Sequence, residues 1–80
     1  MSKLTWNVQF QTTPETTVFV TGLLPLAASI EMTEHINGYG RGTCITIQNG
    51  AAMVSTELPA FIAACLHDAM QRRKIPVTWH

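Results

Sequence analysis

The beginning of the chain alternates apolar and polar residues with a period of two. The apolar positions of this segment are Leu4, Trp6, Val8 and Phe10. Because successive side chains of a strand point to opposite faces, this alternation predicts a strand over 4–10. The β-branched and aromatic run 17–21 predicts a second strand, which pairs with the first as a hairpin and ends at Gly22 and Pro25.

Two Asn-Gly pairs, Asn37-Gly38 and Asn49-Gly50, lie between segments of alternating apolar and polar residues. Both central residues of a type I′ turn have positive φ, and Asn-Gly is the dipeptide that adopts these angles most easily. The two pairs therefore predict a meander of three antiparallel strands joined by two tight turns.

The registers of the two predicted turns agree on one core position. Pairing across the first turn sets Ile30 opposite Ile45, and pairing across the second sets Ile45 opposite Val54. This agreement favours a strand over 26–36. A helix over the same residues is the alternative, because apolar residues also occur there at helical spacing and Gly38 could form its C-cap.

The second half of the chain contains an apolar stripe at three- and four-residue steps. Its members are Leu58, Phe61, Ile62, Cys65, Leu66, Ala69 and Met70. This spacing predicts a helix over 57–73. Thr56 or Ser55 can cap its start, Pro76 ends it, and 77–79 is predicted to form a short final strand.

These elements predict an α+β fold in a single domain, 1–80. The expected architecture is an antiparallel sheet of about five to six short strands, including the meander, covered on one face by a single helix. We find no internal repeat in the sequence. The residues expected to be buried together are Trp6, Val8, Ile45, Val54, Phe61, Ile62, Cys65 and Leu66.

The chain has few charged residues with which to cover its surface. Charged residues make up 12% of the chain, against about 25% in ordinary domains, and five basic residues balance five acidic ones. A small domain with so few charges is expected to expose an apolar patch, which favours a homodimer or a protein partner. Nucleic-acid binding normally needs a basic face and is disfavoured. The sequence contains no apolar run long enough to span a membrane.

The two cysteines, Cys44 and Cys65, are too few for a disulfide framework. We expect both to be reduced thiols in a cytoplasmic protein, with Cys44 on the outer sheet face and Cys65 on the inner helix face. Neither they nor the histidines have the spacing of a metal site, and no cofactor is expected.

No residue pattern indicates catalysis. His67 and Asp68 are neighbours on a predicted helix, so their side chains diverge and cannot act as a dyad. Glu31 and Glu34 lie on opposite faces if 26–36 is a strand. The sequence therefore predicts a protein that is not an enzyme.

Four groups of residues are candidates for contacting a protein partner. They are the small-residue helix flank Ala60, Ala63, Ala64 and His67; the polar sheet face that includes Thr33, His35 and Thr46; the glycine-flanked Tyr39 and Arg41; and the basic residues Arg72 and Arg73.

The function expected from these features is that of a small protein-binding protein, such as an inhibitor, adaptor or assembly factor of phage or mobile-element type. The alternative is a nucleic-acid-binding accessory protein that uses Tyr39, Arg41 and the run 72–74, since an arginine and an aromatic ring can stack on bases. A small-ligand or enzymatic module is a third interpretation.

Overall fold

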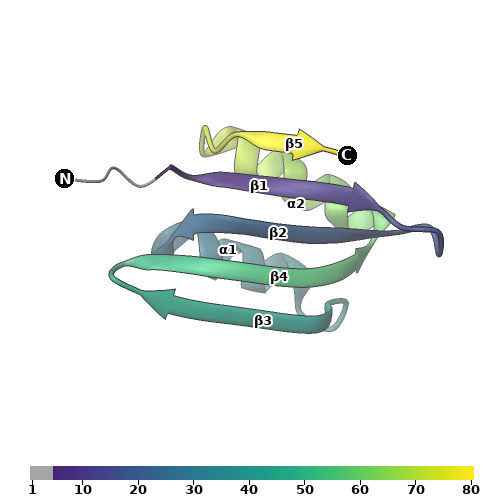
Figure 1. Ribbon diagram of the computed structural model, residues 1–80, viewed down its shortest axis with the longest axis horizontal. Helices are drawn as coiled ribbons and strands as arrows, with labels where there is room; N and C mark the ends of the chain where they lie inside the picture. Colours follow the sequence, from purple (N-terminus) through teal and green to yellow (C-terminus); the bar gives the residue numbers. More distant parts are fainter. Residues whose placement is uncertain (1–4) are drawn as a thin grey trace.

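The computed structural model describes residues 5–80. Its elements, labelled in Figure 1, are β1 (Asn7–Thr12), β2 (Thr17–Pro25), α1 (Leu26–Ile36), β3 (Arg41–Gln48), β4 (Ala51–Pro59), α2 (Ala60–Arg72) and β5 (Val77–Trp79). The first strand thus begins later than the predicted 4–10, and Leu4 lies outside the described residues.

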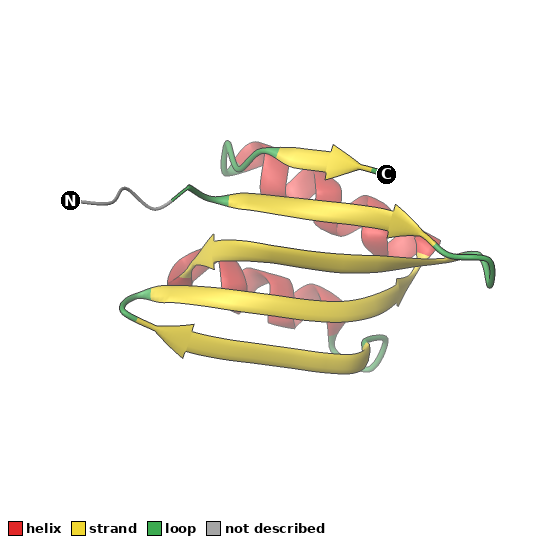
Figure 2. Cartoon of the chain, viewed as in Figure 1, coloured by secondary structure: helices red, strands yellow, loops and turns green. Residues whose placement is uncertain are grey.

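The strands form one mixed sheet in the order β3-β4-β2-β1-β5 (Figure 1). Neighbouring strands are antiparallel except β1 and β5, which run parallel with Val8 opposite Val77. Both helices lie on the same side of this sheet (Figure 2), and both contact β2 and β4. The α+β class is confirmed, but the prediction of a fully antiparallel sheet with a single helix is wrong.

Residues 26–36 form the helix α1, so the strand predicted for this segment is wrong and the helical alternative is correct. The buried residues of α1 are Ala28, Ser29, Met32 and Ile36. Their spacing places them on one helical face, which packs on the sheet and on α2. Ile30, predicted to lie opposite Ile45, is instead 58% exposed on the far side of the helix.

The first Asn-Gly pair follows a helix and does not join two strands. The backbone N–H groups of Tyr39 and Gly40 both donate to the carbonyl of Ile36 at 2.9 Å. Asn37 has φ −56° and ψ 120°, and Gly38 has φ +82°, as in a type II turn. Type II and type I′ turns both need positive φ at the glycine, so the dipeptide alone does not distinguish them.

The second Asn-Gly pair is the predicted hairpin turn. Asn49 and Gly50 have φ of 55° and 76°, and they join β3 directly to β4. The predicted register is confirmed, since Ile45 lies opposite Val54. A two-residue turn fixes the pairing of both strands without help from the rest of the fold.

Helix α2 begins at Ala60 and not at the predicted position 57. Pairing with β2 extends β4 as far as Pro59, which lies opposite Thr17. Pro59 then precedes the first helical turn without a side-chain cap, so the predicted caps are wrong. Thr56 is buried in β4, and its hydroxyl lies 2.7 Å from the hydroxyl of Thr43.

The later start of α2 changes which residues reach the core. Ile62 and Leu66 are buried as predicted, whereas Phe61 is 60% exposed and Cys65 is also exposed. Ala63, predicted to face outward, is fully buried. Once Leu58 belongs to a strand, the buried stripe of the helix centres on Ile62, Leu66 and the alanines beside them, and Phe61 falls outside it.

The fold uses one β-β-α unit twice, which the sequence did not reveal. Elements β1, β2 and α1 begin at Asn7, Thr17 and Leu26, and elements β3, β4 and α2 begin 34 positions later in each case. The units share the dipeptide Leu-Pro where strand meets helix, at 24–25 and 58–59, but few other identical residues. The repeat is therefore one of structure and burial.

The two units are related by an approximate two-fold axis through the centre of the sheet. Thr21 of β2 lies opposite Ser55 of β4, its counterpart in the second unit. On one side of this pair Val18 lies opposite Leu58, and on the other Leu24 lies opposite Ala52. Ala52 is the counterpart of Val18 and Leu58 is the counterpart of Leu24, so exchanging the two units exchanges the two pairs, as a two-fold axis does. The axis is perpendicular to the sheet, because both units lie in one sheet with their helices on the same side.

Candidate protein-binding surface

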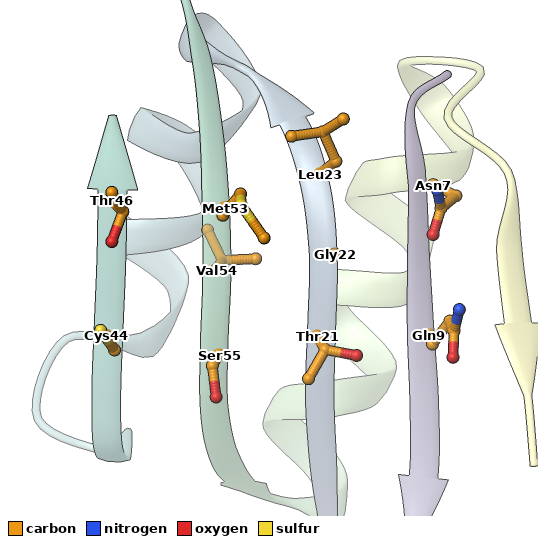
Figure 3. A pocket seen from close by; sticks show the side chains of 10 residues that line it. All are labelled: Asn7, Gln9, Thr21, Gly22, Leu23, Cys44, Thr46, Met53, Val54 and Ser55. Carbon is orange, nitrogen blue, oxygen red and sulfur yellow. The ribbon is translucent and has the colours of Figure 1, made fainter. Parts of the chain in front are cut away.

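The face of the sheet opposite the helices is hollowed near its centre. The hollow has a volume of about 520 Å³ and is open to solvent. Four strands contribute to its lining, as Figure 3 shows. The lining residues are Asn7, Gln9, Thr21, Gly22, Leu23, Cys44, Thr46, Met53, Val54 and Ser55.

The chemistry of this hollow is apolar at one end and polar without charge elsewhere. Met53 is 64% exposed, and Leu23, its neighbour across β2 and β4, is half-buried. Hydroxyl and amide groups surround them, and no residue of the lining carries a charge. Such a surface can bury an apolar side chain and can hydrogen-bond to uncharged groups around it.

The prediction of a polar outer sheet face is correct for β3 and β4. Thr46 and Cys44 lie on this face and line the hollow, as the hairpin register implies. The prediction that Thr33 and His35 lie on the same face is wrong, because they belong to α1 on the other side of the sheet. The hydroxyl of Thr33 donates to the carbonyl of Ser29 within that helix.

The contribution of β1 and β2 to the hollow was not predicted from the sequence. Asn7 and Gln9 are the neighbours of the buried Val8 along β1, and Thr21 and Leu23 are the neighbours of Gly22 along β2. All four residues line the hollow. Their alternation was a usable signal for the face. Their closeness to Thr46 was not predictable, because it depends on β2 lying beside β4.

Only some residues of the small-residue flank of α2 are exposed to solvent. Ala60 and Ala64 are exposed, but Ala63 is buried and contributes to the core. A large side chain at position 63 would therefore disrupt the fold, and a substitution there cannot test a contact with a partner.

His67 has a structural contact that its sequence neighbours do not reveal. The indole N–H of Trp79 donates to Nδ1 of His67 at 3.1 Å, and both rings pack against Phe10. This cluster attaches β5 and the end of the described chain to α2 and β1.

Tyr39 and Arg41 lie where α1 connects to β3. The ring of Tyr39 packs edge-on against Phe61, with centroids 5.5 Å apart, and Arg41 begins the exposed edge strand. This pair of exposed aromatic rings is near the start of α2. Arg72 and Arg73 are at the opposite end of that helix, roughly 18 Å away at 1.5 Å per residue, so the two basic groups do not form one surface.

Arg72 and Arg73 join α2 to α1 through one carboxylate. Arg73 donates to Glu31, and Arg72 also pairs with Asp68 on its own helix. His35 Nε2 lies 3.6 Å from the other oxygen of Glu31. The hydrogen bond from Arg73, with its charge and that of His35, holds the pKa of Glu31 below its ordinary value of 4.5.

We expect the Glu31→Gln variant to lose a pH-dependent part of its stability. A carboxyl group whose pKa is lowered on folding stabilises the protein above its unfolded pKa, and this stabilisation disappears as pH falls through the folded pKa. The difference in melting temperature between wild type and variant should therefore be present near neutral pH and shrink below about 4.5. Glu34→Gln, an exposed change on the same helix, is the control. A difference that persists undiminished in acid would contradict this assignment.

The described residues hold no group of three or more side chains placed to bind a metal ion. Among the residues that line the hollow, Cys44 has no histidine or carboxylate beside it to activate its thiol. Neither α1 nor α2, the helices of the described chain, is long and apolar enough to cross a bilayer.

No family model, curated protein or solved structure matches the chain. The geometry of the surface is therefore the basis for assigning a function.

Proposed function

We propose that the protein is a small, non-enzymatic binding domain that holds a segment of another protein on the open face of its sheet. The observation that supports this is the hollow itself, with Met53 exposed at its apolar end and an uncharged polar surround. Protein-binding surfaces characteristically have few charges at their centre and are enriched in methionine. An inhibitor, adaptor or assembly factor of a phage or mobile element would act through such a surface.

The segment that fits is uncharged and presents an apolar side chain. Burying Met53 against it would contribute up to about 1.5–3 kcal/mol, and covering the half-buried Leu23 would contribute less. The amides of Asn7 and Gln9 and the hydroxyls of Thr21 and Thr46 would bond to its polar groups. A charged segment would lose hydration without gaining an opposite charge.

The cellular location and the possibility of a homodimer belong to the same proposal. Cys44 and Cys65 are both exposed free thiols, on the open sheet face and on α2 respectively, which suits a reducing cytoplasm. A second copy is included among the partners, because β3 leaves a sheet edge open.

A nucleic-acid partner is the alternative, and the distribution of charge opposes it. Arg73 and Arg72 are engaged with acidic groups at the end of α2, whereas Arg41 follows Tyr39, which packs near the start of that helix. Without a continuous basic surface, the release of counterions would contribute little to binding.

Capture with matched variants tests the proposal. The immobilised protein is exposed to extract of its source cell, treated with nuclease, and bound proteins are compared between wild type, Met53→Lys and Ile47→Lys. Met53 and Ile47 have similar exposure, 64% and 60%, on neighbouring strands of one hairpin, but only Met53 lines the hollow. We expect Met53→Lys to reduce recovery of a specific partner by at least about tenfold, since 1.4 kcal/mol corresponds to that factor. Equal recovery by the two variants would refute the use of the hollow.

A further inference from the structure

The outer strands of the two units differ in whether their outer edge is paired with another strand. Strand β1 of the first unit is covered along its outer edge by β5, through the pairs Val8–Val77, Gln9–Thr78 and Phe10–Trp79. Strand β3 is the counterpart of β1 in the second unit, and among the described residues nothing pairs with its outer edge. Figure 1 shows β3 alone at this end of the sheet.

Beyond the bulge between Arg41 and Cys44, the open edge lacks the features that normally protect an edge strand. Natural edges are protected by lysine, proline, inward-pointing charges or very short strands. Strand β3 runs for eight residues, Arg41–Gln48, and its only charge is at the first of them. Ile47 is 60% exposed on the helix side of this strand, next to the half-buried Ile45.

The hairpin register determines which backbone groups face outward. In a two-residue hairpin the residues that flank the turn form a hydrogen-bonded pair, and such pairs then alternate along the ladder. Gln48, Thr46 and Cys44 therefore bond toward β4. The N–H and C=O groups of Ile45 and Ile47 consequently point away from the sheet and are available to another strand.

We propose that β3 pairs antiparallel with β3 of a second copy of this chain, centred on Ile45. Ile45 then lies opposite the partner's Ile45, and Thr43 lies opposite the partner's Ile47. The outward-facing groups of both strands meet as hydrogen-bonded pairs, and the two five-stranded sheets become one continuous sheet.

The self-pairing is compatible with the sequence on both faces. Isoleucine and threonine side chains meet on the helix side, and Cys44 lies opposite the partner's Thr46 on the open side. Arg41, the one charged residue of the strand, lies outside the paired segment, so no like charges oppose each other. The paired segment 43–47 stops short of Gly42, which has φ +62° beside a bulge, and of the turn.

This inference rests on the proposed function only for the presence of a homodimer. The interface shares Cys44 and Thr46 with the lining of the hollow but does not include Met53 or Leu23. Its test uses the same two variants, but here Ile47→Lys is expected to weaken association and Met53→Lys is the control. We expect wild type and Met53→Lys to sediment as dimers over a wide range of protein concentration. Ile47→Lys places a charge on the edge and should weaken association by at least about tenfold, whereas Ile47→Val should retain it. A wild type that is monomeric throughout, or a dimer that Ile47→Lys leaves intact, would overturn the proposal.

Cross-linking tests the register directly. In a Cys65→Ser background, Thr46→Cys introduces a thiol opposite the partner's Cys44. That pair is a non-hydrogen-bonded one, in which the side chains are closest. Oxidised glutathione should convert this variant to a covalent dimer, which denaturing gel electrophoresis and mass spectrometry would detect. Addition of Cys44→Ser should abolish the covalent dimer. A variant that dimerises but forms no cross-link would refute pairing centred on Ile45.

Discussion

Replacing Phe10 with alanine is expected to lower the free energy of unfolding by about 3–5 kcal/mol, the usual loss for a fully buried phenylalanine. Phe10 is completely buried, and its ring packs against Trp79 at 4.8 Å and against His67 at 5.8 Å between ring centroids. The variant would leave a cavity among β1, β5 and α2. Because a domain of this size has a stability of only about 5–15 kcal/mol, a substantial unfolded population should follow.

Phe61→Ala is the matched control for this measurement. The same change of residue at a position that is 60% exposed should cost less than about 1 kcal/mol, through the contact with Tyr39 alone. Urea unfolding followed by circular dichroism gives both values. Similar losses for the two variants would contradict the assignment of Phe10 to the core.

Gly22→Ala should destabilise the protein by about 1–3 kcal/mol, as overpacking at a site without free space does. A Cβ atom at this position would lie 2.6 Å from the carbonyl oxygen of Asn7 and 3.0 Å from the Cα of Val8. Both atoms belong to the backbone of β1, which cannot move aside without disturbing its pairing with β2. The same displacement would alter the hollow, which Asn7 and Gly22 line.

Thr21→Ala, at the adjacent residue of the same strand, separates this close approach from a general effect of substitution in β2. It removes a half-buried side chain on the open face and should cost less than about 1 kcal/mol. Thermal unfolding of both variants is the measurement. If Gly22→Ala melts at the wild-type temperature, the close approach of β1 to β2 at this point is disproved.

The parts of the fold that the sequence predicts correctly are those that local geometry determines. Asn49-Gly50 fixes a hairpin by itself, and the alternation in the first strand requires one buried face. Residues 26–36 satisfy both a strand and a helical period, so only contacts with the sheet and α2 select the helix. The start of α2 fails for a related reason, because pairing of β4 with β2 extends the strand to Pro59.

The candidate surface was predictable in part for the same reason. Strand alternation and the second turn were enough to place Cys44, Thr46 and Met53 on one face. The other side of the hollow comes from β1 and β2, and α1 separates these strands from β3 and β4 in the sequence. Local patterns do not contain the order in which the strands assemble.

The repetition of the β-β-α unit has a consequence for folding. The central strands β2 and β4 come from different units, and each uses the other as its inner neighbour. Within one unit, a hairpin and a helix can form early, because their contacts are close in sequence. Thr21 can pair with Ser55 only when both units are present and folded. Because each helix contacts both β2 and β4, neither helix has its complete packing surface until these two strands pair. The pairing of β2 with β4 is therefore the step at which the whole chain acquires its stability. Unfolding should proceed as one cooperative transition.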